Sequence, residues 1–143
     1  MAGREISTRA LAEILGVTEG AIRKWATKRL LVKVGTQVAQ ADAVQAAVIQ
    51  FLFDKKFSVQ LVRGIMKGIR TTLINATPGT RLRLMCHRQR HSATLVVGND
   101  EDADSALGRA IPMGREIIVF DISQQVIDVS EDFSGAFTAE DDT

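Results

Sequence analysis

Polar and charged side chains gather in residues 18–30, where they alternate with two large apolar residues, Ile22 and Trp25, at helical spacing. In a helix this spacing buries Ile22 and Trp25 on one face and leaves the polar side chains on the other. An outward row of hydrogen-bond donors and cations suits the base edges and phosphates of a nucleic-acid duplex. The row consists of Thr18, Glu19, Arg23 and Lys24.

The residues of this row that we expect to contact bases are Thr18, Glu19 and Arg23. The Arg23 guanidinium can bind a guanine, and the Glu19 carboxylate can accept from a cytosine amino group, with Thr18 beside them. Other polar residues are expected to contact phosphates and position the helix, although a solvated surface charge is the alternative for each lysine. The full set of DNA-binding candidates is Thr8, Thr18, Glu19, Arg23, Lys24, Lys28, Arg29, Lys33, Lys55 and Lys56.

Signals for catalysis or metal binding are weak. Cys86 and His87, with His91 nearby, include a single thiol, and neighbouring residues of a strand point to opposite faces. The acidic residues at 100–104 do not have the spacing of a calcium loop. There is no phosphate-binding glycine loop, nucleophile elbow or arranged Ser, His and Asp set. We therefore expect no enzyme, no bound metal and no cofactor.

Four helices are predicted to position the polar row. The first covers about residues 8–15, is capped by Ser7 or Thr8 and stops at Gly16. The second begins at Thr18, and the third covers about residues 42–56 with an apolar stripe of Val44, Val48, Phe51 and Leu52. The fourth begins at Ser58 and buries Leu61, Val62, Ile65, Met66, Ile69 and Leu73. Gly64 and Gly68 weaken this helix or mark close packing against a neighbour.

The chain changes character at Pro78 and Gly79, which favour a turn. Beyond them, alternating apolar residues predict strands at about 82–86, 93–97, 116–122 and 126–129, with a short helix at 102–110. The predicted class is α+β, a helical domain at 5–75 followed by a small β-rich α+β module at 80–130. Residues 131–143 are expected to be a disordered acidic tail.

Charge is distributed unevenly between the two halves. Residues 1–75 hold twelve Lys or Arg against five Asp or Glu, whereas residues 76–143 hold six against twelve. The basic half is the candidate for nucleic acid. No apolar run approaches the length of about 18 residues that spans a membrane, and no secretory signal opens the chain. One cysteine excludes a disulfide framework and fits a reducing cytoplasm.

Residues 6–69 resemble the winged-helix DNA-binding domain of MerR-type transcriptional regulators. The similarity lies in residues 17–31 (VTEGAIRKWATKRLL), in 41–44 (ADAV) and in 51–59 (FLFDKKFSV). It implies a winged helix-turn-helix with residues 18–30 in the major groove and the segment after them as a wing. Two departures are Gly20, where the family usually has arginine, and Lys24, where it usually has tyrosine.

These observations predict a transcriptional regulator that binds double-stranded DNA sequence-specifically as a homodimer, with the module at 80–130 supplying dimerisation. The expected location is the nucleoid in a prokaryotic cytoplasm. One alternative is an architectural DNA-binding protein, similar to excisionases or plasmid partition adaptors. Another is a protein-interaction module without a DNA role. No residue pattern identifies a small-molecule effector.

Overall fold

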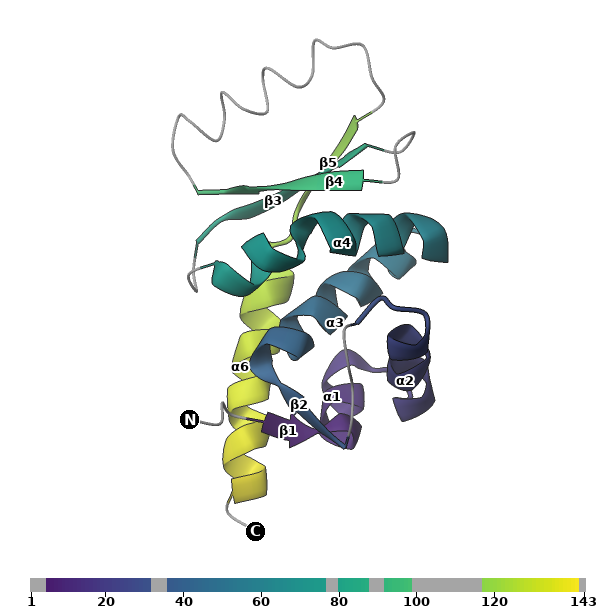
Figure 1. The fold of residues 1–143 in the computed structure, drawn as a ribbon. Helices are drawn as coiled ribbons and strands as arrows, with labels where there is room; N and C mark the ends of the chain where they lie inside the picture. The colour runs from purple at the N-terminus through teal and green to yellow at the C-terminus, as the bar shows by residue number, and fades with distance from the viewer. Residues whose placement is uncertain (1–4, 32–35, 77–79, 88–91, 99–116, 142–143) are drawn as a thin grey trace.

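The computed structural model describes residues 5–31, 36–76, 80–87, 92–98 and 117–141. Within them, helices pack beneath a small three-stranded sheet in an α+β architecture, the predicted class (Figure 1). None of the described helices is long and apolar enough to cross a membrane. The elements are β1 (Glu5–Ser7), α1 (Thr8–Leu15), α2 (Glu19–Thr27), β2 (Gln37–Ala39), α3 (Gln40–Asp54), α4 (Val59–Asn75), β3 (Leu82–His87), β4 (Ser92–Val97), β5 (Ile117–Asp121) and α6 (Ser123–Asp141).

Capping residues define both ends of α1 and the start of α2, as predicted, whereas α2 ends at Thr27 and not at the predicted residue 30. The Ser7 hydroxyl accepts a hydrogen bond from the Ala10 N–H at 3.0 Å and begins α1. Gly16 ends this helix in the left-handed region, with φ of 68°. The Thr18 hydroxyl then accepts from the Ala21 N–H at 3.1 Å and begins α2. The two helices are therefore joined by a short turn whose geometry is determined locally.

Two short strands, one before α1 and one after α2 in the chain, pair with each other. β1 pairs antiparallel with β2, with Ile6 opposite Val38. Both side chains are buried, so the pair closes the lower end of the helical core. This contact brings the residues that precede α1 next to those that precede α3.

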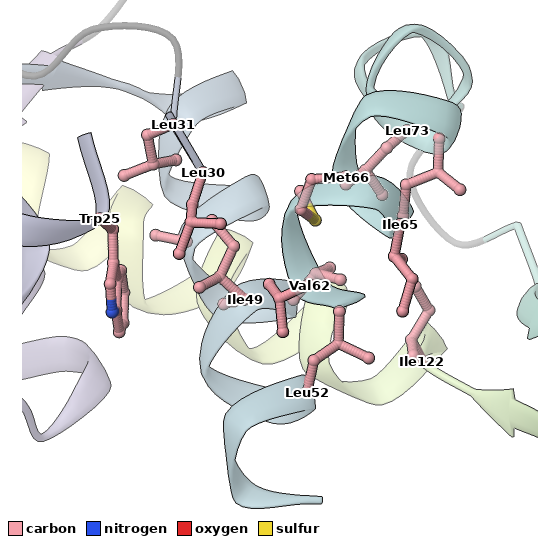
Figure 2. Close-up of a cluster of buried hydrophobic side chains, with 14 of the residues drawn as sticks. Trp25, Leu30, Leu31, Ile49, Leu52, Val62, Ile65, Met66, Leu73 and Ile122 are labelled. Carbon is pink, nitrogen blue, oxygen red and sulfur yellow. The ribbon is translucent and has the colours of Figure 1, made fainter. Parts of the chain in front are cut away.

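α3 is the central helix of the fold. The apolar stripe predicted for it contains fewer residues than the helix buries. Its buried residues extend around most of the helix, because α4, α6, α1 and β2 all pack against it. Val44 and Phe51 of the predicted stripe are only half-buried. Figure 2 shows the part of the core where Ile49 and Leu52 of α3 meet side chains of α4. The buried apolar residues of α3 are Ala43, Ala46, Ala47, Val48, Ile49 and Leu52.

The prediction for α4 is confirmed: Ser58 is its N-cap, and all six of its predicted apolar residues are buried. Gly68 faces β4, where an added Cβ would lie 3.0 Å from the Ala93 carbonyl oxygen. Gly68 therefore allows α4 to pack closely against β4, which is one of the two interpretations that the sequence left open for this glycine.

The three-stranded sheet has the order β4-β3-β5, with both pairs antiparallel. Its strands correspond to those predicted at 82–86, 93–97 and 116–122. Leu82, Leu84 and Cys86 are buried as predicted, but Arg83 and Met85 between them are buried too, so β3 is covered on both faces and not only on the face that the alternation predicted. The helix predicted at 102–110 lies outside the described residues.

The strand predicted at 126–129 and the tail predicted at 131–143 are wrong, because residues 123–141 form the single helix α6. α6 descends from the sheet along α3, α1 and β1, and Phe133 is fully buried (Figure 1). The predicted boundary at residue 130 therefore falls inside a helix. The spacing of Val126, Val129 and Phe133 is helical, and it is the signal that could have identified α6.

Hydrogen bonds to Asp121 define the beginning of α6. Asp121 Oδ1 accepts from the Ser123 N–H at 3.0 Å, and Oδ2 accepts from Arg81 Nε at 3.1 Å. Hydrogen bonds from the Ser123 side chain and backbone, together with Arg81, hold the pKa of Asp121 below its ordinary value of 3.8. The ionised carboxylate is thus the form that favours the folded state.

Replacement of Asp121 by asparagine should make the protein less stable at pH 6, and the difference in stability should become smaller as pH falls below 3.8. A carboxyl with a lowered pKa stabilises the fold above its unfolded pKa and loses this effect as pH falls through the folded pKa. The effect should be below about 1 kcal/mol because Asp121 is largely exposed. Thermal unfolding of both proteins between pH 2 and 6 measures it, and a constant difference across this range would contradict the assignment.

Candidate nucleic-acid interface

The buried face of α2 holds the helix against the core. Ile22 is fully buried, and the Trp25 ring stacks on Phe53 of α3 with 6.1 Å between ring centroids. Trp25 is therefore a core residue and not a platform for stacking bases. These contacts determine which side of α2 faces the solvent.

The exposed face of α2 carries the polar row predicted from the sequence. Arg23, Lys24 and Thr18 are exposed, and Glu19 is half-buried. Arg23 Nη2 lies 3.6 Å from Glu19 Oε2, and the Arg23 side chain keeps 59% of its surface exposed. An exposed ion pair of this kind contributes at most about 1 kcal/mol, so Arg23 can exchange Glu19 for another partner at small cost.

α2 ends in a left-handed turn with a cation at the position that usually takes glycine. The Leu30 N–H donates to the Trp25 carbonyl at 2.8 Å, and the Arg29 N–H donates to the Ala26 carbonyl at 3.0 Å. Arg29 has φ of 63°. In this conformation a residue with a Cβ costs about 1–2 kcal/mol, whereas glycine does not.

Two arginines of α4 hold the end of α2 and the residues just after it, and neither is among the candidates predicted from the sequence. Arg63 Nε donates to the Lys28 carbonyl at 2.9 Å. Arg70 Nη2 donates to the Leu30 carbonyl at 2.8 Å, and its Nε donates to Gln45 Oε1 at 2.8 Å. The two arginines are two turns apart on one side of α4, a spacing that could have suggested a shared role.

The same network reaches a carboxylate at the start of α3. Burial raises the pKa of Asp42 and outweighs the opposing effect of Arg70, while Glu5 raises it further. Arg70 is thus surrounded by groups of the fold itself, and its role is to position the segment after α2.

The end of α1 is held in a similar way by α3. Gln50 Nε2 donates to the Leu15 carbonyl at 2.6 Å. This contact connects the turn before α2 to the central helix. Side chains of α3 and α4 therefore hold the C-terminal ends of both α1 and α2.

Lys55 does not join the row on α2. Its Nζ lies 5.3 Å from the centroid of the Phe51 ring and 5.8 Å from that of Phe120. Phe51 and Phe53 are about 200° apart around α3, and Phe53 is the residue that contacts α2. Lys55 therefore lies on the other side of α3. Lys56 is exposed, with φ of 67°, at the turn before α4.

Of the remaining candidates, Thr8 is wrong as a contact residue, because only 2% of it is exposed. It belongs to the packed start of α1, where burial removes it from any ligand. Lys28 is half-buried at the end of α2, and Arg29 beside it is exposed. Lys33 lies outside the described residues.

Metal ligands do not gather anywhere in the described part of the chain. Among these residues there is no group of three His, Cys, Asp or Glu side chains that could hold an ion. Cys86 is a buried thiol in β3. His91 lies outside the described residues.

In comparisons with known proteins, neither a family model nor a curated protein matched the chain. The geometry of α2 and its surroundings is therefore the basis for a functional proposal.

Proposed function

We propose that the protein binds double-stranded DNA as a homodimer, with α2 in the major groove, and that it regulates transcription. The observation that carries this proposal is the division of α2 into two faces. Ile22 and Trp25 are buried, while Arg23 and Lys24 extend into solvent. A helix packed on one side and basic on the other can enter a groove without unfolding.

The surroundings of α2 support a winged helix-turn-helix. α1 and α2 are joined by a turn at Gly16, and β1, which precedes α1, pairs with β2, which follows α2 in the chain. This order of elements agrees with the resemblance of residues 6–69 to MerR-type regulators. In this arrangement Arg23 exchanges Glu19 for a guanine, and Lys24 and Lys28 contact phosphates.

A dimer follows from the size of the contact. One helix reads only a few base pairs, so specific binding at physiological salt requires two copies on two half-sites. We assign the dimer contact to the sheet module of β3, β4 and β5, which lies above α4 (Figure 1).

Fluorescence anisotropy of the full chain on a labelled random-sequence duplex tests the proposal. The logarithm of affinity should fall linearly with the logarithm of salt concentration, by about 0.9 for each phosphate neutralised. A slope of several units supports DNA binding and justifies selection of a specific site. No binding at low salt would refute the proposal and favour a protein-interaction module.

A further inference from the structure

A basic hollow of about 290 Å³ lies where the end of α2 meets α4. The described residues that line it are Thr27, Lys28, Arg29 and Arg63. Arg63 is 35 residues from Lys28 in the sequence, so the hollow exists only in the folded chain. Trp25, Leu30 and Val62, which are close to these residues in the sequence, belong to the buried core cluster shown in Figure 2.

The hollow concentrates positive charge without a compensating carboxylate. Its three charged residues are all cations, and no acidic residue is among the described residues that line it. The ion pairs found in the described residues involve other arginines: Arg9, Arg23 and Arg81. Like charges held together in this way favour the binding of an anion.

The backbone holds two of these cations in defined positions. Arg63 Nε donates to the Lys28 carbonyl at 2.9 Å, which orients the guanidinium and leaves its terminal nitrogens as the donors of the fork. Arg29 occupies a left-handed position, with φ of 63°, although α1 ends at the same position of its turn with glycine.

The hollow lies at the opposite end of α2 from the residues proposed to contact bases. The nine residues of α2 rise about 13 Å from Glu19 to the hollow. The N-terminal residues of a recognition helix contact the base edges, and phosphates form the edge of the groove. When the first turns of α2 contact bases, the hollow at its C-terminal end is therefore available for a phosphate.

We propose that this hollow binds a phosphate of the DNA backbone, with Arg63 and Arg29 as its principal ligands. The inference rests on the proposed DNA-binding function and adds a contact from α4, a helix outside the α1–α2 pair. Free inorganic phosphate has the same chemistry and is distinguished from the backbone in the test.

The test compares two substitutions on α4 by anisotropy with a random-sequence duplex over a range of salt concentrations. Arg63→Gln removes a cation of the hollow. Lys67→Gln removes an exposed cation one turn further along, outside the described lining. Arg63→Gln should lower the salt slope by about 1 and weaken binding equally on all sequences, whereas Lys67→Gln should not. Equal slopes for the two variants would overturn the inference while leaving DNA binding intact.

Because Arg63 also holds the Lys28 carbonyl, Arg63→Gln can disturb the end of α2, and a second variant tests the phosphate site without removing this hydrogen bond. Arg29→Asn keeps a residue that tolerates the left-handed conformation and removes the charge. It should lower the slope by a similar amount, with an unchanged circular dichroism spectrum. An unchanged slope here would overturn the inference, and absence of salt-dependent binding by the wild type would overturn the proposed function as well.

Inorganic phosphate provides the remaining comparison, with backbone amide NMR signals of residues 28–30 as the readout. Saturable shifts that Arg63→Gln abolishes, together with an unchanged DNA salt slope in that variant, would assign the hollow to free phosphate. This result would overturn the assignment to the DNA backbone.

Discussion

Replacement of Arg23 by alanine should weaken binding to a selected DNA site by about 1–3 kcal/mol, or about 5- to 150-fold in dissociation constant. Arg23 is the exposed arginine in the middle of α2, and its present partner, Glu19, lies 3.6 Å away in an ion pair that opens at little cost. The loss should be largest on the selected site and small on random sequence, because a base contact contributes to specificity. Anisotropy with both duplexes at one salt concentration measures the two values.

Arg9 provides a matched control on α1. It forms an exposed pair with Glu13 at 3.8 Å, with the same spacing along the helix as Arg23 and Glu19. Arg9→Ala removes an equivalent charge and an equivalent ion pair, and it should leave the preference for the selected site nearly unchanged. Equal losses of preference in the two variants would show that α2 is not the helix that reads the bases.

Replacement of Phe133 by alanine should lower the free energy of unfolding by about 3–5 kcal/mol. Phe133 is fully buried where α6 packs on the N-terminal helices. Removing a large buried side chain costs its transfer free energy and leaves a cavity that the neighbours fill incompletely. A loss of this size is a large part of the roughly 5–15 kcal/mol that stabilises a domain. Urea unfolding followed by circular dichroism measures the change.

Glu131 is the control for this substitution, since it lies on the same helix and is exposed. Glu131→Ala should alter stability by less than about 0.5 kcal/mol. If Phe133→Ala has an effect as small as that of Glu131→Ala, α6 does not pack on the helical core. The interpretation of residues 131–143 as an unpacked acidic tail would then be correct.

Much of the N-terminal half could be predicted because its signals are local. Ser7, Thr18 and Ser58 cap helices through hydrogen bonds to backbone groups three residues away. The apolar spacing of α4 indicated its six buried residues correctly, although the helix packs against both α3 and β4. α3 was predicted less well, because a helix surrounded by others buries residues around most of its circumference.

The C-terminal half shows where local signals are insufficient. The polar and acidic residues after Ser130 suggested a tail, and the short apolar run at 126–129 suggested a strand. α6 is helical there and packs on α3, α1 and β1, and its residues Val129 and Phe133 are buried. The stability of such a helix comes mainly from the surface against which it packs.

The sequence by itself determined the helix caps, the two faces of α2 and the identity of the exposed residues Arg23 and Lys24, because each depends on neighbours within two helical turns. Only the tertiary structure decided that Thr8 is buried and that Lys55 lies away from α2. It also decided that Arg63 reaches the end of α2. These features depend on contacts between residues far apart in the chain. No pattern of nearby residues encodes such contacts, because their energy arises only when the folded core brings the partners together.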